Sequence, residues 1–393
     1  MPPVLGVIRE TAPGETRVAL LPEHLKKALA PVKGGPPGWA GVVQAGAGER
    51  AFAFDDAYRA AGAEVVPDAD AVAARCDVLL AVGPPGADLI GSMKPGGVLL
   101  GLLDPAGGGD HLQACAERGV TAIAFERLPR ITRAQKADVL SSMSTAAGYR
   151  AVLRAAALCP KFFPMMMTAA GTITPSRVLV LGAGVAGLQA IATARRLGAI
   201  VEAYDVRAAA REQVLSLGAR FVDLGGVSSD AETAGGYARE QSAEEQARQR
   251  EALAGVIAEA DVVITTALIP GKPAPRLIDA ATVERMRPGA VVVDLAAPAG
   301  GNCELTEPGA TVERGGVRID GPVNLPAELP VDASRMFGQN ALAFLEELRD
   351  DGAVRVDLDN DMVGPACVVH AGELRLDAAR AAPSPAPTEE APS

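Results

Sequence analysis

Short apolar runs alternate with stretches of helical periodicity over the first third of the chain. Such runs are typical of strands that are buried on both faces of a parallel sheet. The runs that predict strands are 4–8, 41–44, 64–66, 77–82, 98–102 and 121–125. Helices are predicted between them at 22–29, 54–61 and 111–118. Strands that alternate with helices indicate βαβ units.

The same alternation returns in the rest of the chain. Strands are predicted at 178–181, 200–204, 220–222, 261–265 and 290–295, and the stretch 354–369 is also strand-like. Helices are predicted at 137–157, 188–197, 251–260 and 329–348. The run Met165-Met166-Met167 is predicted to fill a core, because unbranched thioether side chains adapt to irregular gaps.

Two domains of ordinary size account for a chain of 393 residues. We predict an α/β fold of two Rossmann-like, doubly wound parallel-sheet domains with a cleft between them, joined by long helices. The first domain is discontinuous and the second is inserted into it, with predicted bounds of 1–136 plus 329–377 and 137–328. The Ala- and Pro-rich tail 378–393 is predicted to be disordered.

One polar stretch interrupts the second domain. Residues 225–247 are rich in Gly, Ser and Glu and contain a lone aromatic, Tyr237. Long segments of this kind are either functional lids or disordered linkers, and the tyrosine favours a mobile lid.

The second domain carries the spacing of a dinucleotide-binding loop. After the strand 178–181, Gly182, Gly184 and Gly187 stand at G-x-G-x-x-G spacing, and a helix and a second strand follow. The first glycine permits a tight turn, the second lets the backbone approach a pyrophosphate, and the third lets the helix pack on the strand. The helix N-terminus offers N–H groups and a partial positive charge. The predicted cofactor-binding residues of this loop are Gly182, Ala183, Gly184, Val185, Ala186 and Gly187.

Further cofactor contacts are predicted where two strands end. Asp205 ends the second strand of the fingerprint, where a carboxylate can bond the ribose 2′-OH. It favours NAD over NADP, because a 2′-phosphate beside Asp205 would place like charges together. Arg207 weakens that argument. The other predicted residues at these carboxyl ends, where ligands bind in open α/β sheets, are Val206, Thr266, Ala267 and Leu268.

Composition narrows the functional classes. The net charge of −11 and the lack of a basic block argue against a nucleic-acid surface. No apolar run reaches the roughly 18 to 20 residues that span a bilayer, so no direct membrane span is predicted. The five cysteines are scattered, without the spacing of a metal site or a disulfide framework. We therefore expect reduced thiols in the cytoplasm and no metal.

Several segments together resemble the alanine dehydrogenase and pyridine nucleotide transhydrogenase family over nearly the whole chain. Those segments are Arg9-Glu10 with 15–20, 129–149, 168–172, 268–275 and 300–304. The glycine fingerprint alone matches many dehydrogenases, whereas the series Arg130, Gln135, Asp138, Ser141 and Tyr149 is far more specific. Within the family, the segments are most similar to the soluble NAD(H)-binding α subunit of proton-translocating NAD(P) transhydrogenases.

This resemblance implies an enzyme that works with partner subunits. Hydride would pass directly from NADH on this chain to NADP⁺ on an NADP(H)-binding partner domain, and membrane-spanning subunits would translocate protons. The resemblance also implies a homodimer, cytoplasmic and attached peripherally to the inner membrane through its partners. Direct hydride transfer requires positioning and exclusion of water, and it needs no general acid or base.

The resemblance also assigns roles to residues. Arg130, Asp138 and Ser141 are expected to hold the nicotinamide carboxamide. Gln135 is expected to position the two nicotinamide rings, and Tyr149 to support the pocket. By composition alone the hydroxyl-rich helix 137–157 would be a solvated face, and the resemblance makes it a wall of the nicotinamide pocket. Tyr237 is expected to belong to a loop that closes over nucleotide.

Two other functions compete with this one. An alanine dehydrogenase shares Arg17 as a carboxylate ligand, but it needs a lysine in a K-V-K-E-P segment and a histidine after the next strand. Here those regions contain Ala81-Val82-Gly83-Pro84-Pro85 and Leu102-Leu103-Asp104-Pro105. Deamination requires such an acid/base pair. The third function, a non-catalytic NAD-binding regulator, would not need the series from Arg130 to Tyr149. Lys136 and Pro298 depart from the family pattern and affect only the expected nucleotide affinity.

Overall fold

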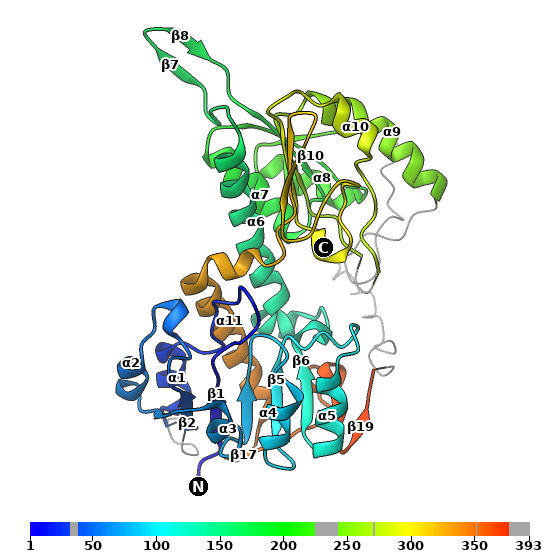
Figure 1. Cartoon of the computed structure of the whole chain (residues 1–393). Coiled ribbons are helices and arrows are strands. Elements are labelled where there is room, and N and C mark those ends of the chain that lie inside the picture. Colours follow the sequence, from blue (N-terminus) through cyan, green and yellow to red (C-terminus); the bar gives the residue numbers. More distant parts are fainter. Residues whose placement is uncertain (32–37, 225–242, 270–271, 351, 377–393) are drawn as a thin grey trace, which may run out of the picture. The chain divides into compact units, whose positions relative to one another are not determined.

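The computed structural model describes residues 1–31, 38–224, 243–269, 272–350 and 352–376. The chain forms two compact units (Figure 1). Unit 1 is Met1–Met143 with Leu329–Ser393, and unit 2 is Ser144–Glu328. The chain crosses between them inside helix α6 (Val139–Leu158) and just ahead of helix α11 (Pro330–Leu345).

Unit 1 is built on an eight-stranded sheet in the order β19-β18-β6-β5-β4-β1-β2-β3. The strands from β3 to β6 are parallel, and β18 and β19 add antiparallel pairs at the β6 edge. The parallel order 3-2-1-4-5-6 is that of a doubly wound dinucleotide-binding fold. Its strands are β1 (Val4–Val7), β2 (Ala40–Gln44), β3 (Glu64–Val66), β4 (Val78–Leu80), β5 (Val98–Gly101), β6 (Thr121–Ala124), β18 (Cys367–His370) and β19 (Glu373–Leu374).

Helices connect the strands of unit 1. They are α1 (Pro22–Leu29), α2 (Asp55–Ala60), α3 (Ala69–Ala73), α4 (Ala87–Ser92), α5 (Asp110–Arg118), α11 and α12 (Val363–Ala366). Pro22 stands at the first position of α1, where its missing N–H costs no hydrogen bond. Asp68 caps α3 by accepting the Ala71 N–H.

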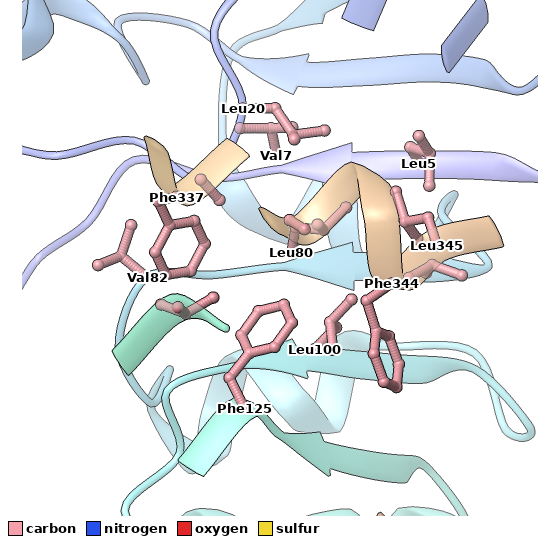
Figure 2. Close-up of a cluster of buried hydrophobic side chains, with 14 of the residues drawn as sticks. Leu5, Val7, Leu20, Leu80, Val82, Leu100, Phe125, Phe337, Phe344 and Leu345 are labelled. Carbon is pink, nitrogen blue, oxygen red and sulfur yellow. The ribbon is translucent and has the colours of Figure 1, made fainter. Parts of the chain in front are cut away.

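An aromatic cluster closes the core of unit 1 under α11 (Figure 2). Phe125, which follows β6, meets Phe337 and Phe344 of α11 edge-on, with ring centroids 5.7 and 5.8 Å apart. Leu80 and Leu100 pack in the same cluster from the central strands. The segment after residue 328 thus belongs to the core of unit 1, because its helix buries its apolar face there.

Unit 2 has a seven-stranded sheet in the order β11-β10-β9-β12-β13-β15-β14, whose first five strands repeat the 3-2-1-4-5 order of unit 1. All pairs are parallel except β14 with β15. The strands are β9 (Arg177–Leu181), β10 (Ile200–Tyr204), β11 (Arg220–Phe221), β12 (Val262–Thr265), β13 (Val291–Asp294), β14 (Thr311–Arg314) and β15 (Val317–Asp320). The helices are the part of α6 from Ser144 onward, α7 (Val185–Arg196), α8 (Ala208–Ser216), α9 (Ala243–Glu259) and α10 (Ala280–Arg285).

Two arginines of α6 form ion pairs with carboxylates at and after the end of strand β15. Arg154 donates from Nε and Nη2 to both oxygens of Asp320 at the end of β15, each at 2.8 Å. It also donates from Nη1 to Glu328, and Arg150 donates to the other oxygen of that carboxylate. Asp320 is fully buried, so its charge depends on this bidentate partner.

The prediction that Met165–Met167 fill a core is wrong. A hairpin of β7 (Met166–Thr168) and β8 (Gly171–Ile173) projects from the rest of unit 2, with Gly171 in a left-handed turn (Figure 1). Met167 is 80% exposed and Met165 is 58% exposed. Hydropathy alone favours a core for this run, whereas the two strands pair with each other and leave their side chains outside.

Other local predictions also differ from the structure. The stretch 354–369 contains a two-residue strand β17 (Ala353–Val354), paired with β16 (Arg349–Asp350), then a turn region, α12 and β18. Helix α9 begins at Ala243, inside the stretch predicted as a lid. The rest of that stretch, Tyr237 included, lies outside the described residues, as does the tail 378–393.

All five cysteines are buried, and none forms a disulfide. Burial raises the pKa of Cys76 and Cys115 to about 12, and the pKa of Cys303 and Cys367 to about 11. Thiolate, the reactive form, is therefore scarce at these four positions near neutral pH. None of the helices in the described ranges is long and apolar enough to cross a membrane.

Candidate dinucleotide site

The glycine loop of unit 2 lies between the end of β9 and the start of α7. Gly182 has φ +98°, and a Cβ built there would lie 2.6 Å from Thr266 Oγ1. A Cβ on Gly187 would lie 1.9 Å from the Gly182 carbonyl oxygen, so only glycine allows this close packing of helix on turn. Both positions need glycine for steric reasons.

The middle glycine faces open space instead. Among the residues that the structure describes, no heavy atom lies within 4 Å of a Cβ built on Gly184, which is the N-cap of α7. No side chain in the described part of the chain caps this end of the helix, so the first N–H groups of α7 lack a side-chain acceptor there. Open space beside a helix N-terminus fits the pyrophosphate of a dinucleotide, with Val185 and Ala186 in the first turn.

Asp205 follows β10 and is tied to the loop by hydrogen bonds. Its Oδ2 accepts the Ala183 N–H at 2.7 Å, and its Oδ1 accepts the Arg207 N–H at 2.8 Å. The Arg207 side chain also donates to both oxygens, Nε to Oδ1 and Nη2 to Oδ2. Only 6% of Asp205 is exposed. The intervening Val206 is partly buried and packs against the hydrophobic cluster of unit 2 that contains Tyr204 and Leu253. That Asp205 binds a ribose hydroxyl stays a prediction.

The residues after β12 close the other side of the loop. Thr266 donates from Oγ1 to the Gly182 carbonyl oxygen at 3.0 Å. Ala267 donates its N–H to Asn302 Oδ1, and Asn302 Nδ2 donates back to the Ala267 carbonyl oxygen. Leu268 is about half exposed. The fully buried Asn302 therefore fixes the strand end through both groups of its amide.

Sequence reasoning did not assign Asn302 or Asp294 a role at this edge. Asp294, at the end of β13, accepts the Thr265 hydroxyl and the Ala296 N–H on Oδ1. Its Oδ2 accepts the Cys303 N–H and the Thr306 hydroxyl. A carboxylate at the end of an apolar strand was the signal for Asp294, since a buried charge needs such a set of donors.

Two of the predicted carboxamide-binding residues, Asp138 and Ser141, stand at the start of α6. Asp138 accepts the Ser141 N–H on Oδ1 at 2.9 Å and the Ser141 hydroxyl on Oδ2 at 2.6 Å. Asp138 thus caps α6 in this structure. Gln135, in the 3₁₀ helix η3 (Thr132–Ala137), is exposed, as is Arg130. Tyr149 belongs to unit 2 and is 41% exposed.

Helix α11 holds the segment that carries Gln135. Asn340 Nδ2 donates to the Lys136 carbonyl oxygen at 2.8 Å, and Asn340 is buried. The backbone of Lys136 is therefore fixed within unit 1 although its side chain is exposed.

At the carboxyl edge of the unit 1 sheet, the described segments 81–85 and 102–105 contain neither a lysine nor a histidine. The N–H groups of Val82 and Gly83 donate to the buried carboxyl of Glu10, and burial raises the pKa of Glu10 to about 7. Arg17 pairs with Glu15 through Nε and Nη2. His111 lies with Nε2 2.6 Å from the Leu103 carbonyl oxygen. Sequence reasoning assigned no role to Glu10 or Glu15, although both lie in segments that carry the family resemblance.

The chain matches the two domain models of one known protein family. Residues 6–147 match the N-terminal domain of the alanine dehydrogenase/PNT family, and residues 151–377 match its C-terminal domain. The chain belongs to the alanine dehydrogenase/PNT family. It is 45% identical to an NAD(P) transhydrogenase subunit alpha chain of Rhodospirillum rubrum, over 94% of this chain and 97% of that protein.

Within the family, the chain is more similar to transhydrogenases than to alanine dehydrogenases. A crystal structure of a transhydrogenase from Sinorhizobium meliloti matches with a TM-score of 0.84 and 43% identity, over 95% of this chain and 100% of that one. The alanine dehydrogenase of Mycobacterium tuberculosis is 30% identical, over 94% of each chain.

Proposed function

We propose that this chain is the NAD(H)-binding α subunit of a proton-translocating NAD(P) transhydrogenase. The observation that carries the proposal is the glycine loop, with its crowded outer glycines, its open middle glycine and the carboxylate of Asp205 bonded to its backbone. The family and its named transhydrogenase α subunits supply the reaction. Bound NADH supplies the hydride.

The residues of this chain bind and orient the cofactor. The free end of α7, with Gly184 at its N-cap, takes the pyrophosphate, and Asp205 takes the adenosine ribose. Thr266 holds the turn at Gly182. Arg130, Asp138 and Ser141 bind the nicotinamide carboxamide, and Gln135 sets the ring against a second nicotinamide. Tyr149 supports the pocket, and Tyr237 lies in the segment that closes over nucleotide.

The partners follow from the reaction. NADP⁺, bound on a separate NADP(H)-binding subunit, accepts the hydride, and membrane-spanning subunits couple the transfer to proton translocation. The chain is cytoplasmic and attached to the inner membrane through these subunits. It acts as a homodimer, which the exposed apolar hairpin supports: Met165, Met167 and Ile173 lie exposed on an arm that a second copy can cover.

A reconstituted assay tests the function. The chain is mixed with the NADP(H)-binding subunit of a related transhydrogenase, and single-turnover hydride transfer is followed by stopped-flow absorbance. We expect transfer between nucleotides in the mixture and no deamination of alanine by the chain alone. Deamination of alanine, or no transfer by a chain that binds NADH, would contradict the proposal.

Gln135→Asn tests the role of ring placement in the same assay. The shorter amide should slow transfer by up to about 10²-fold, since a displacement of about 1 Å at the reacting centre has that cost. NADH affinity should change little, because the side chain of Gln135 is exposed. Transfer at the parent rate would exclude Gln135 from ring placement.

A further inference from the structure

Helix α6 passes close to the glycine-loop helix α7 at Gly148. A Cβ built on Gly148 would lie 2.1 Å from the Ala186 carbonyl oxygen and 3.0 Å from the Ala186 Cα. Ala186 is in the first turn of α7, two positions after the Gly184 N-cap. The backbone of α6 therefore passes directly against the turn that holds the pyrophosphate in the proposed function.

The packing on either side of this contact gives the direction of α6. Beyond Gly148, Ala151 and Ala155 join the core that also contains Ala190 of α7. Further along, the Leu158 carbonyl oxygen accepts a hydrogen bond from Arg318, near the amino end of β15. Helices α6 and α7 thus both run from the carboxyl edge of the sheet toward its amino edge.

Two hydroxyl side chains lie one turn ahead of the contact. Ser144 and Thr145 precede Gly148 by four and three positions, so they share its face of the helix. A helix rises 1.5 Å per residue, which places them about 5 Å past the contact, beyond the carboxyl edge of the sheet. Both are half-buried. They therefore lie alongside the open space at Gly184.

The position of α6 across the sheet selects one half of the nucleotide. Arg154 of α6 pairs with Asp320 of β15, which lies on the opposite side of β9 from β10. Asp205, at the end of β10, marks the adenosine side. Residues of α6 therefore face the other half of a dinucleotide bound at the α7 N-terminus.

We propose that Ser144 and Thr145 contact the nicotinamide half of the bound dinucleotide, next to its pyrophosphate, and that Gly148 is the positioning residue that brings them there. This inference rests on the proposed function, because it assumes NADH bound at the α7 N-terminus. Any side chain at position 148 moves the N-terminal part of α6 away from α7 and withdraws both hydroxyls.

Gly148→Ala tests the positioning role, with Gly255→Ala as its matched control. Gly255 also lies within a helix, α9, but no atom of the described ranges lies within 4 Å of its built Cβ, so alanine is tolerated there. NADH and 5′-AMP binding are measured by calorimetry. We expect Gly148→Ala to bind NADH roughly ten-fold more weakly and 5′-AMP as the parent does. The control should match the parent for both ligands.

Equal weakening of NADH and 5′-AMP would overturn the inference, because the contact would then only support the loop. Unchanged NADH binding by folded Gly148→Ala would overturn it as well. If circular dichroism shows that Gly148→Ala does not fold, the double variant Ser144→Ala/Thr145→Val decides, since it adds no atom at the contact.

We expect the double variant to bind NADH roughly ten-fold more weakly and 5′-AMP normally. NADH binding equal to that of the parent would overturn the inference and leave the proposed function intact. A parent chain that does not bind NADH at all would contradict the proposed function itself.

Discussion

The side chain of Arg207 returns to the carboxylate of Asp205, with Nε 3.0 Å from Oδ1 and Nη2 2.9 Å from Oδ2. The same carboxylate accepts the Ala183 N–H of the glycine loop. Asp205 would repel the 2′-phosphate of NADP and Arg207 would attract it, and the two side chains form an ion pair with each other. The negative partner is the more deeply buried of the two, and it is the one bonded to the loop.

Asp205→Asn should therefore reduce the preference for NADH over NADPH. Charge-assisted hydrogen bonds contribute about 1.5–3 kcal/mol, so we expect NADH affinity to fall by about 10- to 100-fold. NADPH affinity should hold or rise, because Arg207 then faces a 2′-phosphate without a carboxylate beside it. Titration of nicotinamide fluorescence measures both. An unchanged ratio of the two affinities would contradict the assignment of Asp205, and Asp223→Asn, in a surface pair with Arg211, serves as control.

Glu10 should make the stability of unit 1 depend on pH. Burial is the main cause that raises the pKa of Glu10 in the folded chain to about 7, above its ordinary value of 4.5. The folded state then holds a proton that the unfolded state has lost. The resulting stabilisation is present below about pH 4.5 and is lost as the pH rises through about 7.

Glu10→Gln tests this dependence, because glutamine cannot ionise. From pH 5 to pH 8 the parent should lose roughly a few kcal/mol of unfolding free energy relative to the variant. Urea denaturation followed by circular dichroism at both pH values measures it. A difference that is constant with pH would mean that Glu10 titrates near its ordinary value.

Arg154→Met should destabilise unit 2 strongly. Among the residues that the structure describes, the substitution leaves the fully buried Asp320 with the Thr311 hydroxyl as its remaining side-chain donor. Removing one partner of a buried pair costs about 3–5 kcal/mol, and the partial exposure of Arg154 favours the lower end. Arg75→Met removes a surface pair with Glu64 and should cost at most about 1 kcal/mol. Comparable losses in urea melts of the two variants would refute the role of the pair.

The hairpin should carry self-association. Met167→Asp places a charge on the most exposed apolar side chain of the β7–β8 arm, and we expect it to weaken the homodimer by at least about ten-fold. Sedimentation equilibrium measures the dissociation constant. Leu215→Asp, at a lone exposed leucine of α8, is the matched control and should leave association unchanged. A parent that is monomeric at all concentrations, or a Met167→Asp dimer as tight as the parent, would exclude the arm.

Sequence patterns predicted those helices and strands that a local signal in the sequence specifies. The prediction for 200–204 matches β10 residue for residue, and 22–29 matches α1. Both are fixed by local signals, a largely apolar run in one case and an N-terminal proline in the other. Short helices such as α3 and α10 were not predicted, because each has only one or two turns and is stabilised mainly by its cap and its packing.

The parts of the site that depend on residues close together in the sequence could be predicted from their spacing. The steric need for Gly182 and Gly187 follows from their spacing, and the structure shows the contacts that require it. The need for glycine at 148 arises from a contact with a residue 38 positions later, which no local pattern encodes. The hydrogen bonds between Asn302 and the backbone of Ala267 likewise join segments that are adjacent only in the folded sheet.

The burial of all five cysteines has a practical consequence for experiments on this chain. A maleimide probe at neutral pH reacts with thiolate, which the raised pKa of Cys76, Cys115, Cys303 and Cys367 keeps scarce. A single cysteine introduced on the β7–β8 arm would therefore take up a spin label or a fluorophore selectively, with the native thiols left in place. A label at that position would then report whether two copies of the otherwise unaltered chain associate.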